Sequence, residues 1–443
     1  MLYRVLKFLI GLGIKLYYSQ IKIENKKYLK PNGKPMIIVA NHPNTLMDAW
    51  VIGMICKQPI YYMAKATLFD SSFKLKLLRS LNMIPINRKG EGIIKGVDNE
   101  DSLSACYNVL AEGKTLVIFP EGTSYKERVL RKLKTGTARI ALETEKRNGW
   151  KLDLQIVAVG LNYSQQERFR SSIFIDIDKP RNVLQYKESY ENDSREAAQQ
   201  LTNAIRKRLE NVLFTSDTND EGVLVEQISR VMHSKYTASQ GGVNKEVREM
   251  KDITKRLDEI KILQPWLMEE ITAKIKSINW KLEKLHIRTD FLDRRFRSTS
   301  FLRQMTLAVL FVLLAIPIMV FGVIHNVLQF LFTDWIVPKM STDVEYYAPL
   351  AILVGIPLYP LCYAGFAIFA YHLVDLNWVL LTLYLILMPL TGLFAYWFVK
   401  YLKFIGYTWQ YMLLIVDRKQ VLKDLQQNKN QLRKMLFDPT FDE

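Results

Sequence analysis

The segment from Met36 to Asp48 reads MIIVANHPNTLMD. It begins with an apolar run rich in β-branched side chains, which is typical of a buried strand. Pro43 and Asn44 favour a turn, and an apolar helix-forming run follows from Thr45. The pattern predicts a strand, a loop and a helix, with His42 in the loop. Loops after strands are where α/β proteins place their chemistry.

His42 and Asp48 allow two interpretations. Imidazole accepts a proton near neutral pH, and a nearby carboxylate would fix its tautomer, so the pair would activate an alcohol as a nucleophile. Alternatively, Thr45 and Asp48 belong to a helix capping box. Side chains six positions apart on one helix lie on different faces. Catalysis therefore requires His42 in the loop and Asp48 in the first helical turn, where the carboxylate can also serve as a cap.

The pattern around this segment predicts an α/β domain between residues 21 and 214, with a largely parallel sheet flanked by helices. Strands are expected at residues 36–40, 60–64, 83–87, 115–119, 154–162 and 172–177. Helices are expected at residues 45–56, 72–81, 102–112 and 135–146.

Charge and hydropathy point to a membrane. The net charge of +17 over 443 residues favours an anionic partner. Residues 305–332, 347–374 and 378–399 are apolar nearly throughout, which indicates an integral membrane protein. A nucleic-acid partner would explain the charge but not these stretches, and none is expected.

The charges beside the apolar stretches predict an orientation. Four arginines between residues 294 and 303 precede the first stretch, and Lys400 and Lys403 follow the last, which places both ends on the cytoplasmic side. The loop with Asp343 and Glu345 is then expected on the opposite side. Three complete crossings contradict this pattern, whereas two or four satisfy it, so the number of crossings stays open. Prolines make residues 347–374 a candidate broken or re-entrant helix.

These patterns divide the chain into five parts. Residues 1–20 are expected to form a helix in the membrane interface, with a basic stripe of Arg4, Lys7, Gly11 and Lys15 turned toward lipid phosphates. The α/β domain follows at 21–214, and a basic helical arm at 215–303 connects domains or mediates homo-oligomerisation. The last two parts are a hydrophobic membrane region at 304–403 and a charged tail at 404–443.

No cofactor or metal is expected. Cys56, Cys106 and Cys362 lack the spacing of metal ligands or disulfides, and glycine-rich nucleotide loops are absent from the sequence. Any enzymatic chemistry would come from side chains alone.

Three further blocks end strands of the predicted domain. Arg88 closes the first and has a side chain suited to grip phosphate. The second reads LVIFPEGTS over residues 116–124, and its glycine-containing loop can aim N–H groups at a ligand. The third, residues 157–163, contains Gly160. Singly each has a plain alternative: Arg88 as a surface charge, Glu121 with its glycine as a turn, and Gly160 as a packing residue.

In this order the four blocks resemble the glycerolipid acyltransferase family, which includes glycerol-phosphate and lysophosphatidate acyltransferases, over about residues 21–180. The resemblance implies that His42 is the general base and Asp48 its orienting partner. It also implies that the acceptor is held by Arg88, Glu121, Gly122 and Thr123, and that Lys65 binds phosphate.

The sequence departs from the family pattern in three places, one of which is Asn82, where a glycine is common. Five residues separate His42 from Asp48, where the family usually has four. Ser124 stands where many lysophosphatidate enzymes have an arginine. Arg128 is the suggested replacement, with Arg131 and Lys134 as alternatives, although these residues also fit a solvated basic face.

The resemblance implies an acyltransferase, and the apolar stretches and their flanking charges place its catalytic domain on the cytoplasmic face of a membrane. A bacterial inner membrane is favoured over the endoplasmic reticulum. The enzyme would move a fatty acyl group from acyl-CoA or acyl-carrier protein to a hydroxyl of glycerol-3-phosphate, dihydroxyacetone-phosphate or lysophosphatidate, in phospholipid synthesis. The bilayer, the thioester donor and the phosphorylated acceptor are the implied partners. Two alternatives stay open: an acyltransferase for another lysolipid or aminolipid, and a catalytically silent membrane scaffold.

Overall fold

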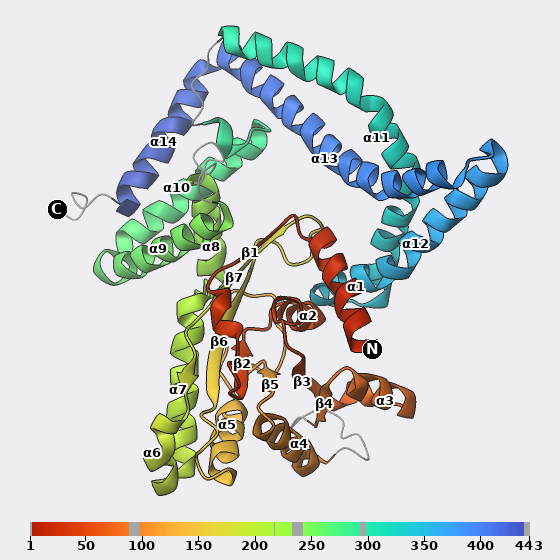
Figure 1. Cartoon of the computed structure of the whole chain (residues 1–443). Helices are drawn as coiled ribbons and strands as arrows, with labels where there is room; N and C mark the ends of the chain where they lie inside the picture. The colour runs from red at the N-terminus through yellow and green to blue at the C-terminus, as the bar shows by residue number, and fades with distance from the viewer. Residues whose placement is uncertain (1, 88–97, 217, 233–241, 293–297, 438–443) are drawn as a thin grey trace. The chain divides into compact units, whose positions relative to one another are not determined.

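The computed structural model describes residues 2–87, 98–216, 218–232, 242–292 and 298–437 (Figure 1). The chain forms two units. The first comprises Met1–Asp217 together with Ser341–Ile352, and the second comprises Thr218–Met340 and Leu353–Glu443. A short segment from the apolar part of the sequence thus belongs to the same unit as the α/β domain.

The first unit is built on one eight-stranded sheet with the order β1-β7-β6-β2-β5-β3-β4, in which β8 pairs with β6. All pairs are parallel except those that β7 and β8 make with β6. The strands are β1 (Gln20–Ile23), β2 (Met36–Ala40), β3 (Ile60–Lys65), β4 (Met83–Ile86), β5 (Thr115–Ile118), β6 (Gln155–Tyr163), β7 (Ser172–Ile177) and β8 (Arg181–Asn182). The six predicted strands are confirmed. The strands β1 and β8 were not predicted: β1 alternates polar and apolar residues over only four positions, and β8 consists of two polar residues.

Helices cover both faces of the sheet, which confirms the predicted fold class. Ile37 and Val39 point into a core shared with α4 (Asn99–Ala111), α5 (Gly136–Arg147) and α7 (Ser194–Val212). On the opposite face Tyr62 donates a hydrogen bond to the carbonyl of Ala49 in α2 (Thr45–Ile55). The predicted helices match α2, α3 (Ser72–Ser80), α4 and α5, and the short α6 (Lys187–Asn192) precedes α7.

Helix α1 (Leu2–Tyr17) corrects one expectation. Lys7 does not lie on a lipid-facing stripe, because its Nζ donates a 2.7 Å hydrogen bond to the carbonyl of Cys56 at the end of α2. Gly11, on the same face, is buried against Met54. Arg4 and Lys15, the other charged residues of the predicted stripe, are exposed. The exposed apolar residues of α1 are Leu2, Val5, Phe8, Leu12 and Leu16. Periodicity separates the two faces of a helix but does not say what each one meets.

The segment 341–352 corrects a second expectation. It contains the turn η6 (Val344–Tyr346) and the first residues of α12 (Tyr347–Val374), and it packs within the α/β unit. A Cβ atom on Gly13 of α1 would lie 2.8 Å from Ile352. The loop with Asp343 and Glu345 therefore lies on the α/β domain and not across a membrane from it. Acidic residues contribute little to the orientation signal, which explains the error.

The second unit includes four helices that bury one another's apolar stripes: α8 (Asn219–Met232), α9 (Gly242–Leu263), α10 (Pro265–Lys284) and α14 (Lys419–Phe437). Leu257 of α9, Ile275 of α10 and Leu425 of α14 are among the buried residues. The sequence suggested two helices packing as a hairpin or against a partner. The structure buries the stripes of α9 and α10 within the chain, together with those of α8 and α14.

The same unit contains most of three helices that are long and apolar enough to cross a membrane: α11 (Ser298–Met340), α12 and α13 (Trp378–Asp417). Helix α12 runs without a break through Pro357 and Pro360, so the predicted break is wrong. Prolines are tolerated in membrane helices because neighbouring groups satisfy the freed carbonyls. Arg294, Arg295 and Arg297, which supported the orientation, lie outside the described residues.

Candidate active site

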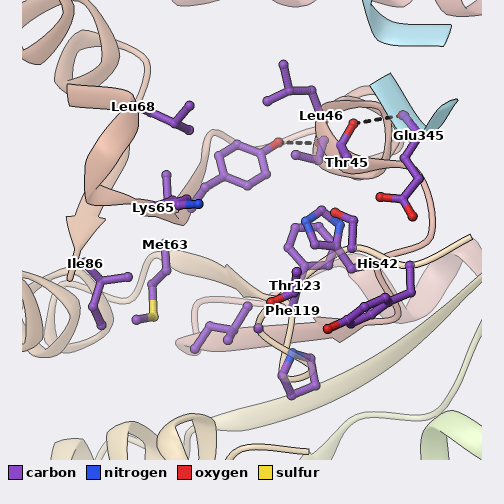
Figure 2. Close-up of a pocket in the computed structure, with 18 of the residues that line it drawn as sticks. His42, Thr45, Leu46, Met63, Lys65, Leu68, Ile86, Phe119, Thr123 and Glu345 are labelled. Atoms are coloured by element: carbon purple, nitrogen blue, oxygen red, sulfur yellow. Dashed lines mark hydrogen bonds between the residues drawn. The ribbon is translucent and has the colours of Figure 1, made fainter. Parts of the chain in front are cut away.

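The central strands of the sheet bring their carboxyl ends together. Because β6, β2, β5 and β3 are neighbours and run parallel, the residues that end or follow them lie along one edge. His42 follows β2, Phe119 follows β5, Lys65 ends β3 and Tyr163 ends β6. Figure 2 shows His42, Lys65 and Phe119 around one cavity.

His42 and Asp48 are paired. Nδ1 of His42 lies 2.9 Å from Oδ2 of Asp48. Helix α2 begins at Thr45, so His42 lies in the preceding loop and Asp48 in the first turn, as the sequence required. Oδ2 also accepts a 2.7 Å hydrogen bond from the backbone N–H of Asn44, the N-cap residue. The carboxylate therefore contributes to capping as well as to holding His42.

Thr45 has an unusual backbone conformation between these two residues. Its φ is +42°, which is left-handed and strained for a β-branched side chain. The strained turn lies within the segment that contains the extra residue and joins His42 to Asp48. The Thr45 hydroxyl donates a 3.1 Å hydrogen bond to the carbonyl of Glu345. The first turn of α2 is thus tied to the 341–352 segment.

Two tyrosines that the sequence analysis did not single out support the pair. The Tyr163 hydroxyl donates a 2.7 Å hydrogen bond to Oδ1 of Asp48, which is fully buried. Burial and the nearby Asp48 charge raise the pKa of Tyr163 well above its ordinary range, so it remains a hydrogen-bond donor. The Asn44 side chain donates to the hydroxyl of Tyr18. A tyrosine at the end of a strand beside β2 was the available signal for Tyr163.

Phe119 and Glu121 position His42 from the other side. The Phe119 ring stacks on the imidazole with centroids 4.0 Å apart and planes 12° apart. Glu121 accepts hydrogen bonds from the backbone N–H of His42 at 3.1 Å and of Arg131 at 3.3 Å. Burial raises the pKa of Glu121, although these two bonds act in the opposite direction. The carboxylate ties two loops together.

His42 opens onto a cavity of about 1050 Å³. Its charged lining residues are Lys65, Lys126, Lys134, Asp343 and Glu345. Apolar residues line much of the remainder and include Met83 and Ile140. Leu46, Met63, Leu68 and Ile86 are further apolar lining residues (Figure 2). The cavity therefore combines an ionisable base, cationic groups and apolar surface.

The structure separates the predicted site residues into groups. The residues that line the cavity are His42, Lys65, Gly122 and Thr123, while Asp48 and Glu121 are not among its lining residues. Arg128 is not among them either, since its Nη2 donates to the carbonyl of Tyr163 at 3.2 Å. Lys134 is the candidate from that loop that lines the cavity. Arg88 lies outside the described residues.

Gly160 fits its plain alternative. A Cβ atom there would lie 2.2 Å from the carbonyl oxygen of Val212, at the end of α7, so the residue permits close packing.

The buried cysteines are also remote from the chemistry. Burial raises the pKa of Cys56 and of Cys106 to about 12, and neither lines the cavity.

Comparison with known proteins finds acyltransferases. Residues 20–162 match the Acyltransferase family model. The chain is 27% identical over 144 residues to glycerol-3-phosphate O-acyltransferase 1 of Saccharomyces cerevisiae, a match that covers 32% of this chain and 19% of that protein. It is 33% identical over 90 residues to an uncharacterized acyltransferase of Schizosaccharomyces pombe, covering 20% of this chain and 13% of that protein. The matches thus span less than a fifth of either yeast protein.

Among solved structures, the chain is similar to the 1-acyl-sn-glycerophosphate (LPA) acyltransferase PlsC from Thermotoga maritima. The match has a TM-score of 0.33 and 20% identity, and it covers 46% of this chain and 79% of that one.

Proposed function

We propose that this chain, whose residues 20–162 match the Acyltransferase family model, transfers a fatty acyl group from an acyl thioester to a hydroxyl of a glycerol-phosphate acceptor. The donor would be acyl-CoA or acyl-carrier protein. The observation that carries the proposal is the 2.9 Å contact between His42 and Asp48 beside a cavity with cationic and apolar lining.

His42 is the general base in this proposal. Because Nδ1 donates its proton to Asp48, the lone pair of Nε2 is available for the acceptor hydroxyl. As that hydroxyl oxygen bonds to the thioester carbonyl carbon, Nε2 takes its proton. The tetrahedral intermediate then collapses, the C–S bond breaks and the electron pair leaves with the thiolate. The imidazolium can protonate the thiolate and regenerate the base.

The loop after β5 supplies donors for the developing oxyanion. Thr123 and Ser124 line the cavity, and their backbone N–H groups make no hydrogen bond within the part of the chain that the structure describes. Preorganised donors of this kind usually make a large contribution in acyl transfer. Gly122 precedes them with a φ of +82°, a conformation that glycine adopts without strain.

The lining residues suit both the phosphate of the acceptor and the acyl chain of the donor. Lys65 and Lys134 provide positive charge for a phosphate group, and the apolar side of the cavity suits a fatty acyl chain. The exposed apolar face of α1 would lie in the membrane interface, and the three long apolar helices would anchor the protein. A cytoplasmic site supplied with acyl thioesters for phospholipid synthesis is part of the proposal.

One observation favours a second candidate acceptor. Asp343 and Glu345 bring carboxylates to the same cavity, where they would attract an ammonium group. An aminolipid acceptor is therefore the alternative. A silent scaffold receives no support from the geometry, because His42 is paired with Asp48 and lines the cavity.

Acyl transfer by the purified full chain in detergent tests the proposal. Acyl-CoA and acyl-carrier protein would each be offered with glycerol-3-phosphate, dihydroxyacetone-phosphate, lysophosphatidate and an amino-lysolipid. We expect transfer to a phosphorylated glycerol that falls by at least about a hundredfold in His42→Ala. Undiminished transfer in that variant would exclude His42 as the base, and transfer only to the amino-lysolipid would support the second candidate.

A further inference from the structure

Glu345 is held in the cavity at two points although it comes from a distant part of the chain. Its carbonyl accepts the hydrogen bond from Thr45, three residues after His42, and its Oε1 accepts a 2.9 Å hydrogen bond from the backbone N–H of Lys126. The Lys126 ammonium is paired with Glu167. The carboxylate of Glu345 is therefore fixed in place by an uncharged donor.

The second carboxylate oxygen is available to a ligand. Oε2 of Glu345 makes no hydrogen bond within the described ranges of the chain, and the residue lines the cavity. In Figure 2 the Glu345 carboxylate and the Lys65 side chain lie on opposite sides of the His42 ring. The cavity thus has a cationic side and an anionic side with the base between them.

This polarity matches one kind of acceptor. A phosphate is attracted to Lys65 and repelled by Glu345, so the acceptor would point its phosphate away from the carboxylate. An ionised carboxylate accepts strong hydrogen bonds from hydroxyl groups. Glycerol-3-phosphate has one phosphate and two free hydroxyls, so one hydroxyl can meet the base while the other meets the carboxylate.

On the basis of the proposed function, we propose that Glu345 is a specificity residue that binds the hydroxyl of glycerol-3-phosphate that does not react. Lysophosphatidate has only one free hydroxyl, because its other one is already esterified. With that acceptor Oε2 would lose its partner, and a site built around a substrate hydroxyl discriminates strongly against analogues that lack it. The 341–352 segment would thus select for the first acylation of the glycerol backbone over the second.

The experiment compares acceptors that differ by one hydroxyl. The values of kcat/KM would be measured for glycerol-3-phosphate, for 3-hydroxypropyl phosphate and 2-hydroxypropyl phosphate, which each lack one hydroxyl, and for lysophosphatidate. The proteins are the full-length wild type, Glu345→Ala and Glu345→Gln, with Asp343→Asn as the control that removes a charge from the same loop. The better one-hydroxyl acceptor serves as the reference.

We expect Glu345→Ala to lower kcat/KM for glycerol-3-phosphate by about 10- to 100-fold, the range of a hydrogen bond to a charged group. The reference acceptor should change by less than about threefold, which also shows that the variant is folded. Glu345→Gln keeps an acceptor atom and should lose less. Asp343→Asn should shift all phosphorylated acceptors alike and leave their ratio unchanged.

Two results overturn the inference. An equal loss on both kinds of acceptor would make Glu345 a purely structural contact, and a general gain in rate would make the loop an obstruction. Absence of any transfer to phosphorylated acceptors by the wild type would instead refute the proposed function, so the two failures are distinguishable.

Discussion

The hydroxyl of Tyr163 donates a 2.7 Å hydrogen bond to Oδ1 of Asp48, and His42 uses the other oxygen of the same carboxylate. The bond joins the end of β6 to the first turn of α2. Because Asp48 is fully buried, each hydrogen bond to it offsets part of the cost of removing a charge from water. Tyr163 therefore acts on His42 through the carboxylate that both residues contact.

Tyr163→Phe should lower both stability and turnover. The substitution leaves Oδ1 of Asp48 without its buried donor, which typically costs about 1–3 kcal/mol. We expect a lower Tm in detergent and a kcat reduced by about tenfold, with KM little changed because Tyr163 does not line the cavity.

Tyr190→Phe is the matched control, since the Tyr190 hydroxyl also donates to a carboxylate, that of Glu143, at 2.9 Å. It is expected to affect Tm but not kcat. If both variants lowered kcat equally, the Tyr163–Asp48 bond would have no special role in positioning His42.

At position 45, glycine should give a more stable protein than alanine, which is the reverse of their usual order in a helix. Glycine near a helix start is ordinarily less favourable than alanine, but the φ of +42° at Thr45 strains any residue with a Cβ atom. Thr45→Ala and Thr45→Gly both lose the hydrogen bond to Glu345, so their difference isolates the backbone. We expect Thr45→Gly to be the more stable by about 1 kcal/mol, measured by denaturant unfolding in detergent. The opposite order would show that the left-handed conformation is relaxed in the variants.

The parts of the site that are close in sequence could be predicted, and the distant parts could not. His42 and Asp48 lie in one strand–loop–helix segment, so local pattern and spacing were sufficient to place them. Tyr163 depends on β6 pairing with β2, which no local pattern specifies. Glu345 lies between two long apolar stretches, so its acidic loop was assigned from charge to the far side of a membrane. The direction of side chains could not be predicted from the sequence either. Lys134 and Arg128 belong to the same basic loop, but Lys134 lines the cavity and Arg128 bonds to the carbonyl of Tyr163.

Lys134 is expected to replace the arginine that the Glu121–Ser124 block lacks. Its side chain lies against Gly122 and lines the cavity, whereas Arg128 bonds to the backbone of Tyr163. Lys134→Ala should raise KM for a phosphorylated acceptor by about tenfold, because one charge-assisted contact to phosphate is lost.

Arg128→Ala should instead lower Tm and leave the KM for that acceptor within about twofold. Steady-state kinetics with the same acceptor for both variants, beside thermal melts, provide the comparison. If only Arg128→Ala raised KM, Arg128 and not Lys134 would be the residue that binds the phosphate, as the sequence suggested.

Glu121 predicts a pH dependence of stability. Burial raises its pKa above the ordinary value of 4.5, while the N–H groups of Arg131 and His42 act in the opposite direction. A carboxyl group with a raised pKa stabilises the fold fully below its ordinary pKa, and this contribution is lost as the pH rises through the raised value. The free energy of unfolding of the wild type should therefore fall, relative to Glu121→Gln, as the pH rises above the ordinary pKa of 4.5.

Glu143 provides the control with the opposite sign. Although burial acts to raise its pKa, the hydrogen bonds from Arg147 and Tyr190 prevail and lower it. Its contribution is present above its ordinary pKa and is lost as the pH falls, so the wild type should lose stability relative to Glu143→Gln on acidification. Denaturant unfolding of the three proteins at pH values both below and above 4.5 measures both slopes. Slopes of the same sign would mean that burial does not dominate at Glu121, and that the two backbone bonds favour its ionised form strongly enough to offset desolvation.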